Sequence, residues 1–297
     1  MKNANTSITA FQPGADIASP HNTVKGKNIP IPYVNWDNIG PAGSINACVN
    51  ELSQWMMLQL NKGTLGGKKY WDEKRTYEMW EYNINKPVSK WQRENMPSRH
   101  ANGYGMGWEL MEYGGHKIVS HGGGYDGMIS KTILIPDMNL GFVILTNSNN
   151  SLPSAMGFEF LDLFLGVTGS KNWVMEFAPK EEEPLLATAT SGAKFAWNTP
   201  VKSEIDGIYR SDMYGDVEVL KNGEFYKIDF KPTELFKGNL SHIDNNVFRL
   251  HWSTQMMLPS GKIQFLSNME GEIEELRVFV ENPDFDFSEL KLYKVKD

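Results

Sequence analysis

Cysteine, long apolar runs and clustered positive charge are scarce or absent in this 297-residue sequence. The single cysteine, Cys48, allows no intrachain disulfide, which excludes a disulfide-stapled fold. It stands on the apolar side of a helical pattern, so we expect it to be a small core residue. No apolar run reaches roughly 18 residues, so the sequence predicts no transmembrane segment. Residues 1–24 contain no apolar core of a signal peptide.

The charge balance and the histidine spacing exclude further classes. Lysine and arginine number 29 against 36 acidic residues, a net charge of −7, and no run of five basic residues occurs. We therefore expect no nucleic-acid partner. The six histidines show no metal-binding spacing, so no metal site is predicted. The glycine-rich stretch 122–127 precedes a strand-like run rather than a helix, so it offers no helix N-terminus to a phosphate, and we expect no cofactor.

By residue pattern, the sequence divides into three parts. Residues 1–166 combine helical and strand patterns, residues 167–203 are polar with little periodicity, and residues 204–297 carry strand patterns with a turn signal about every ten residues. We predict an α+β domain over 1–166, in which helices flank an antiparallel sheet. A linker over 167–203 and a small all-β barrel over 204–297 follow it.

Within the first part, a turn-rich arm covers residues 1–43 and a loop covers 88–103. Apolar spacing predicts helices over three ranges: 45–62, 70–85 and 153–166. β-branched and apolar runs predict strands over 105–113, 116–120, 127–135 and 140–147. In the barrel part, Asn222-Gly223 is the strongest hairpin signal.

The candidate functional stretch of the sequence is His121-Gly122-Gly123-Gly124, which follows a strand pattern. Two interpretations stay open from the residues alone. The glycines form a tight turn between two strands, or they let a ligand lie against bare backbone, because glycine has no Cβ.

The stretch resembles the third motif of the serine β-lactamase and penicillin-binding-protein superfamily, in its class C-like branch. In that branch the Lys-Thr-Gly of the edge strand is often replaced by His-x-Gly, here His121-Gly122-Gly123. YGMGWEL before it, GFVILTN after it and the glycine turn and helix at 40–63 follow the family's order. Judged from their strand pattern, the last ~95 residues resemble the lipocalin-like barrel that is often appended to these hydrolases.

The resemblance implies a serine hydrolase that forms and hydrolyses an acyl-enzyme from a peptide, ester or lactam carbonyl. It implies that His121 faces the substrate, that Gly123 keeps the strand edge open and that Gly124 donates its N–H to the oxyanion. Gly122 and Tyr125 are expected to line the substrate site. It also implies a periplasmic or secreted location.

The sequence departs from the family at its nucleophile. Ser-x-x-Lys occurs only at 191–194 and 288–291, and Tyr-x-Asn at 33–35, and none of these stands where the family requires it. We therefore expect a fragment whose N-terminal part is missing and which is inactive alone. Its sheet should keep a bare edge, so we expect self-association into homo-oligomers.

Two other functions stay open. The scaffold is a non-catalytic module that binds a peptide-like or cell-wall ligand, or the barrel alone carries a small ligand. An in-frame upstream Ser-x-x-Lys would favour the enzyme.

Overall fold

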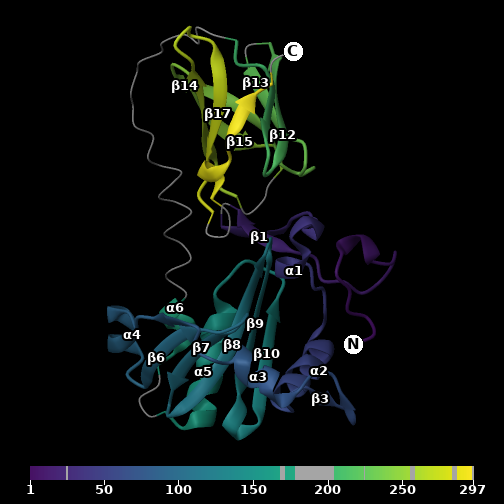
Figure 1. Cartoon of the computed structure of the whole chain (residues 1–297), viewed down its shortest axis with the longest axis vertical. Coiled ribbons are helices and arrows are strands. Elements are labelled where there is room, and N and C mark those ends of the chain that lie inside the picture. The colour runs from purple at the N-terminus through teal and green to yellow at the C-terminus, as the bar shows by residue number, and fades with distance from the viewer. Residues whose placement is uncertain are drawn as a thin grey trace. The chain divides into compact units, whose positions relative to one another are not determined.

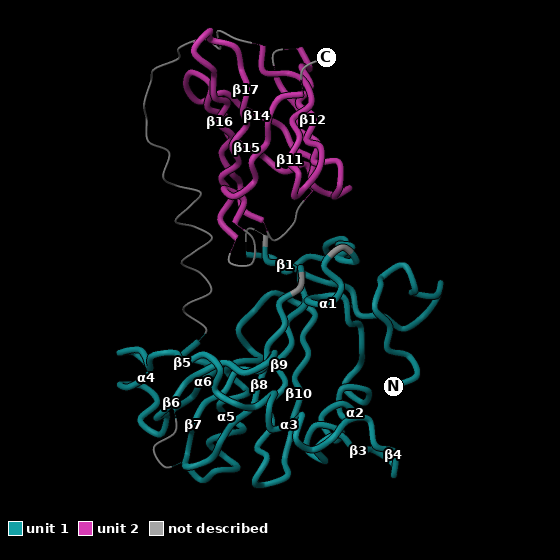
Figure 2. Tube along the Cα trace, in the orientation of Figure 1, with its two compact units in different colours: residues 1–181 teal, residues 182–297 magenta. Residues whose placement is uncertain are grey.

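The computed structural model describes residues 1–24, 26–167, 171–177, 204–223, 225–254, 258–282 and 286–295. The chain forms two compact units, Met1–Glu181 and Glu182–Asp297 (Figure 2). Most of the predicted linker 167–203 lies outside the described residues. In the described part of the chain, no helix is both long and apolar enough to cross a membrane.

The first unit is built on a six-stranded antiparallel sheet with the strand order β10-β9-β8-β7-β6-β5 (Figure 1). Its strands are β5 (Ile84–Lys86), β6 (Arg99–Tyr104), β7 (Glu109–Tyr113), β8 (His116–Tyr125), β9 (Met128–Ile135) and β10 (Leu140–Thr146). Gly114 and Gly115 both have positive φ, which suits the tight hairpin between β7 and β8. The expected α+β fold with an antiparallel sheet is confirmed.

Helices cover both faces of this sheet. The helices α5 (Leu152–Leu165) and α6 (Trp173–Phe177) pack on the face that carries Ile118 and Ile133. The helix α2 (Val49–Leu60) packs on the opposite face, where Met56 meets Val119 and Leu134. Because successive strand residues point to opposite faces, the adjacent apolar residues Ile118-Val119 of β8 and Ile133-Leu134 of β9 supply both cores.

Short elements complete the unit: β1 (His21–Val24), β2 (Lys27–Pro30), α1 (Gly40–Gly43), β3 (Thr64–Leu65), β4 (Lys68–Lys69), α3 (Glu73–Met79) and α4 (Lys90–Asn95). The predicted loop 88–103 is wrong, because it contains α4 and most of β6. Ser89 and Gln92 form a capping box that begins α4, a signal present in the sequence as Ser-x-x-Gln.

Helix boundaries also differ from the prediction at residues 45 to 48. The helix begins at Val49, and Cys48 is an exposed N-cap residue rather than a core residue. Ile45 is exposed as well. The cause is the N-terminal arm, since Asn5 pairs with Asn46 in an isolated bridge and holds this segment extended. Tyr77 of α3 and Phe164 of α5 are exposed as well.

The second unit is a closed antiparallel barrel, as expected. Its strands are β11 (Gly207–Ser211), β12 (Gly215–Asn222), β13 (Phe225–Phe230), β14 (Lys237–Asp244), β15 (Val247–Trp252), β16 (Gly261–Ser267), β17 (Ile273–Phe279) and β18 (Leu292–Lys294). The strand β11 closes the barrel by pairing with both β12 and β18. Large buried side chains fill the core: Tyr209, Phe230, Phe248, Phe265 and Phe287. This filled core disfavours a carrier function for the barrel.

Candidate active site

The glycine run is part of strand β8 rather than a turn. Gly122, Gly123 and Gly124 pair with residues 131, 130 and 129 of β9, and the reversal of the chain comes later, at Asp126-Gly127. The tight-turn interpretation of these glycines is therefore wrong. Gly127, with φ +71°, is the turn glycine, and a Cβ there would lie 2.6 Å from the His21 backbone nitrogen.

The strand β8 is open on its other side along the glycine run. The strand β7 begins at Glu109, which pairs with Ser120, so the β7 ladder covers β8 only up to the residue before His121. Neighbouring residues of a strand direct their N–H and C=O groups to alternate sides. Among the described residues, part of the backbone of 121–125 therefore faces no ladder partner on this side.

Steric need explains only one of the three glycines. A Cβ on Gly123 would lie 2.5 Å from Ser130 Oγ. A Cβ on Gly122 would lie 3.5 Å from its nearest neighbour and one on Gly124 3.7 Å, both ordinary contacts. Glycine weakens a strand, so its use at 122 and 124 has no internal packing reason and suits close approach of a ligand.

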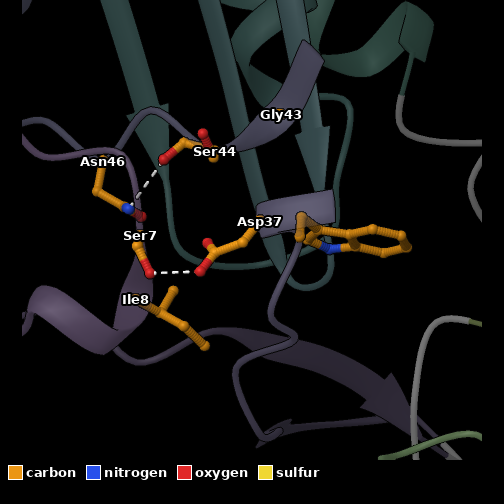
Figure 3. Close-up of a pocket in the computed structure, with 7 residues that line it drawn as sticks. Ser7, Ile8, Asp37, Gly43, Ser44 and Asn46 are labelled. Atoms are coloured by element: carbon orange, nitrogen blue, oxygen red, sulfur yellow. Dashed lines mark hydrogen bonds between the residues drawn. The ribbon is translucent and has the colours of Figure 1, made fainter. Parts of the chain in front are cut away.

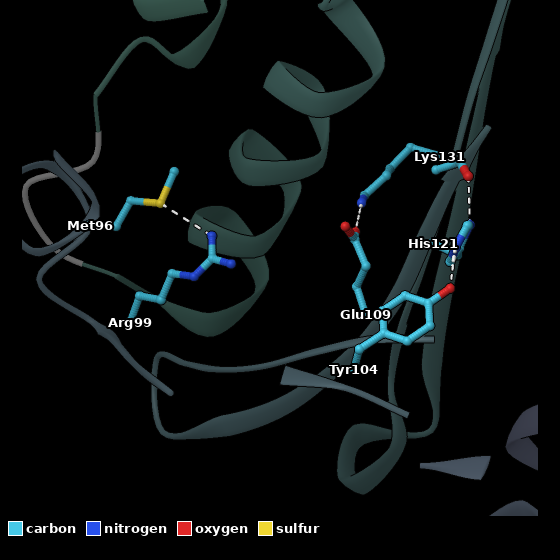
Figure 4. Close-up of polar contacts among 7 residues, drawn as sticks. Met96, Arg99, Tyr104, Glu109, His121 and Lys131 are labelled. Atoms are coloured by element: carbon cyan, nitrogen blue, oxygen red, sulfur yellow. Dashed lines mark hydrogen bonds and ion pairs between the residues drawn. The ribbon is translucent and has the colours of Figure 1, made fainter. Parts of the chain in front are cut away.

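His121 lies at the start of the open segment with both ring nitrogens engaged (Figure 4). Its Nδ1 lies 2.6 Å from the Gly122 carbonyl oxygen, and its Nε2 lies 2.9 Å from Tyr104 Oη. The two rings meet edge to face with centroids 5.9 Å apart. The imidazole is exposed, so a substrate can reach it.

Charged groups from neighbouring strands surround this pair. Lys131 on β9 forms a 2.7 Å ion pair with Glu109 on β7 (Figure 4). The Lys86 ammonium lies 5.0 Å from the centroid of the Tyr104 ring, a cation–π contact. Burial acts to raise the pKa of Glu109, but Lys131, His121 and Lys86 together hold that pKa below its usual value.

The serine beside the run is not placed as an activated nucleophile. Ser130 Oγ donates to the Gly123 carbonyl oxygen at 3.5 Å. Activation needs a base that takes the hydroxyl proton, and a carbonyl oxygen does not do this. The site as described offers backbone donors, an imidazole and a phenol, which suit binding and polarising a carbonyl.

The Ser-x-x-Lys and Tyr-x-Asn stretches of the sequence do not lie at the glycine run. Ser288 donates to Asp286 in a 3₁₀ turn of the barrel unit, and Ser191-Gly192-Ala193-Lys194 lies outside the described residues. Tyr33 donates its hydroxyl to the Ala18 carbonyl and packs against Phe11. Tyr125 ends β8 opposite Met128, and its role in substrate binding stays a prediction.

Sequence reasoning missed Tyr104, Lys86, Glu109 and Lys131. They come from β6, β5, β7 and β9, so no short motif joins them. Only the register of the sheet brings these four residues to His121 and Gly122.

A small hollow near the N-terminal arm offers no comparable chemistry (Figure 3). It is lined by Ser7, Ile8, Trp36, Asp37, Gly43, Ser44 and Asn46. Ser7 donates to Asp37 at 2.7 Å. This lining contains no histidine or lysine, so a serine hydrolase site has no base there.

Comparisons with known proteins give a family-model match in each unit. Residues 206–294 match a domain of unknown function, DUF3471, and no curated protein matches the chain. Among solved structures, the chain is similar to the octameric penicillin-binding protein homologue from Pyrococcus abyssi, with 17% identity and a TM-score of 0.46. The alignment covers 98% of this chain and 56% of that one.

The chain is also similar to SurE, with 14% identity and a TM-score of 0.36, over 96% of this chain and 58% of that one. It thus spans a little over half the length of the solved structures it matches. Residues 1–161 match the Beta-lactamase family model, which is more than half of the chain. The chain therefore belongs to the Beta-lactamase family.

Proposed function

We propose that this chain supplies the strand wall of a serine hydrolase active site. The reaction is formation and hydrolysis of an acyl-enzyme on a peptide, ester or lactam carbonyl. The observation that supports it is the open side of β8 along residues 121–125, which begins with an accessible imidazole and continues with bare glycine backbone.

The chemistry follows from the direction of the backbone groups. A substrate with an extended amide or ester lies along the open side of β8 and accepts N–H donors there, as an added strand does. In this proposal Gly124 N–H is one oxyanion donor, and His121 contacts the substrate or assists proton transfer. Gly123 keeps Ser130 packed close to the strand and the edge free of side chains.

We propose further that the nucleophile belongs to a Ser-x-x-Lys motif in polypeptide outside these 297 residues. The two Ser-x-x-Lys stretches in the sequence are the barrel turn at 288–291 and the segment 191–194. Without an activated serine, N–H donors polarise a carbonyl but form no acyl-enzyme. A periplasmic or secreted location is part of the same proposal and rests on the family.

A fluorophosphonate probe tests the proposal, because it labels activated serines covalently. The 297-residue chain should not react. The product of the same reading frame extended upstream should react, and replacing the serine of an upstream Ser-x-x-Lys by alanine should abolish labelling. Labelling of the 297-residue chain at Ser130 or any other serine would overturn the missing-nucleophile argument.

A non-catalytic binding module is the second candidate, and the same open edge supports it. Strand addition needs backbone donors and acceptors but no nucleophile. An extended product that binds peptide-like ligands yet never reacts with the probe would select this function over hydrolysis.

A further inference from the structure

We propose that the Gly122 carbonyl holds His121 in the Nδ1–H tautomer, so that Tyr104 donates to Nε2 and the phenol oxygen of Tyr104 is the outward proton acceptor of the pair. The tautomer is a property of the described residues themselves. Its use in catalysis rests on the hydrolase function proposed above.

The first step concerns Nδ1 of His121. It lies 2.6 Å from the carbonyl oxygen of Gly122, the next residue along β8. A carbonyl oxygen only accepts hydrogen bonds. Two acceptors at this separation would repel each other, so the Nδ1 must carry the proton and donate it.

The second step concerns Nε2. A neutral imidazole carries one ring proton, so with Nδ1 protonated the Nε2 is an acceptor. Tyr104 Oη lies 2.9 Å away and has one hydrogen to donate. Tyr104 therefore donates to His121 Nε2. The two hydrogen bonds agree on a single tautomer.

Neighbouring groups hold the phenol in place. Tyr104 ends β6 opposite Glu109, its ring meets the imidazole edge to face, and Lys86 lies against it at 5.0 Å. Lys131, the other nearby cation, is engaged by Glu109 at 2.7 Å. Tyr104 is thus a positioning residue, placed by the sheet register rather than by a local motif.

The arrangement sets the path of a proton. Since Tyr104 Oη gives its hydrogen to Nε2, its lone pairs remain free to accept. When a proton arrives at Oη from a bound molecule, a new O–H bond forms, the old O–H bond breaks and an Nε2–H bond forms. His121 becomes an imidazolium and Tyr104 stays neutral, so charge and protons balance.

Long-range ¹H–¹⁵N NMR of the ring nitrogens tests the tautomer directly in the ¹⁵N-labelled 297-residue chain. A variant His121→Gln assigns the His121 signals, and the other five histidines serve as references in the same spectrum. At a pH where the ring is neutral, wild type should show a protonated Nδ1 and a bare Nε2.

Removing the phenol hydroxyl should free Nε2 of its donor without changing the tautomer, because the Gly122 carbonyl still holds the proton on Nδ1. In Tyr104→Phe, Nδ1 should stay protonated and the bare Nε2 signal should move downfield, away from its protonated position. The matched control Tyr70→Phe removes an exposed phenol hydroxyl from the same unit and should leave the Nε2 signal unmoved.

A wild-type ring protonated mainly on Nε2 would overturn the proposal, and this reading needs no variant to fold. An unmoved Nε2 signal in a folded Tyr104→Phe protein would show that Tyr104 does not donate to Nε2, and would overturn it as well. Neither result depends on acylation. The NMR experiment therefore tests the tautomer, and the fluorophosphonate experiment tests the hydrolase function, independently of each other.

Discussion

Lys131 on β9 and Glu109 on β7 form an ion pair across the strand that lies between them, with 2.7 Å between Nζ and Oε2. The intervening strand is β8, and the register partner of Lys131 on it is Gly122. A Cβ on Gly122 would lie 3.8 Å from Lys131 Cδ, so the lysine stem runs beside bare backbone. The ion pair neutralises the lysine charge beside Gly122, and the accessible basic groups of the candidate site are then His121 and Lys86.

Breaking this pair should cost stability in a pH-dependent way. The pKa of Glu109 lies below its usual value, so its contribution is present above the unfolded pKa, about 4.3, and is lost as the pH falls through the folded pKa. Lys131→Met should therefore reduce the free energy of unfolding at pH 7 by no more than about 1 kcal/mol, since Glu109 is half exposed.

Urea denaturation at pH 7 and pH 3 measures the effect. Lys74→Met is the control, because Lys74 is highly exposed and pairs with Glu78 at 3.6 Å. An equal loss for Lys131→Met at both pH values would show that packing of the lysine stem, rather than the ion pair, stabilises the strand.

Alanine at Gly123 and at Gly124 should distinguish the glycine that packing requires from one that packing does not require. Gly123→Ala places a Cβ 2.5 Å from Ser130 Oγ and should destabilise the unit by about 1–2 kcal/mol. Gly124→Ala meets its nearest atom at 3.7 Å and should be neutral or stabilise by up to ~1 kcal/mol. The double variant Gly123→Ala with Ser130→Ala should recover most of the loss, measured by thermal unfolding. No recovery would mean that Ser130 is not the obstacle.

A buried carboxylate joins α5 and α6 to the sheet. Asp162 accepts from Tyr113 Oη, and Trp173 Nε1 donates to its other oxygen at 2.6 Å. Asp162→Ala leaves both donors buried without this acceptor and should cost about 2–4 kcal/mol in chemical denaturation. Asp162→Asn keeps an acceptor oxygen and should cost less. In a double-mutant cycle, Tyr113→Phe should add less on the Asp162→Ala background than on wild type, and strict additivity would contradict the shared network.

The N-terminal arm should detach from α2 on acidification. Asn3 and Ala4 donate their N–H groups to Glu51 Oε1 at 2.6 and 2.9 Å, and the bond from Asn3 is the main cause of the lowered pKa of Glu51. The contact is thus present above the usual pKa of a glutamate, about 4.3, and is lost as the pH falls through the lower folded value.

Amide chemical shifts of Asn3 and Ala4 report this titration. They should move in an acid step that Glu51→Gln removes and that the exposed control Glu112→Gln leaves in place. If the Asn3 and Ala4 amides keep their wild-type titration in Glu51→Gln, the Glu51 carboxylate is not the group that holds the arm on α2.

The free edge of the sheet should promote self-association. Among the described residues, β10 pairs on one side only, with β9, and its sequence LGFVILT carries no charge. Beside it, Phe142 contacts Phe160 of α5, and Leu163 and Phe164 are exposed on that helix. An uncharged edge strand next to an apolar helix face is a ready association surface.

Sedimentation velocity should detect oligomers of the wild-type chain at micromolar concentration. Leu163→Lys with Phe164→Lys should shift the distribution toward monomer, while Met269→Lys, which changes an even more exposed apolar side chain of the barrel, should not. A monomeric wild-type chain at all concentrations would show that this surface does not associate.

The sequence alone determined the α+β class, the antiparallel sheet, the all-β barrel and the family resemblance. Each rests on local patterns: β-branched and apolar runs such as 127–135, turn glycines such as Gly114-Gly115 and motifs read in order along the chain. It did not determine where helices begin, because the contact of Asn5 with Asn46 holds residues before Val49 extended. Nor did it place Cys48 outside the core.

The tertiary structure alone decided that the glycine run is strand and that Tyr104, Lys86, Glu109 and Lys131 gather near His121. Glycine occurs both in turns and at strand positions that a ligand approaches closely, so composition alone could not separate the two. The choice depends on the pairing of β8 with β9 and on the start of β7 at Glu109. Register is a long-range property, set when side chains on both faces find their cores, and a single stretch of sequence does not contain it.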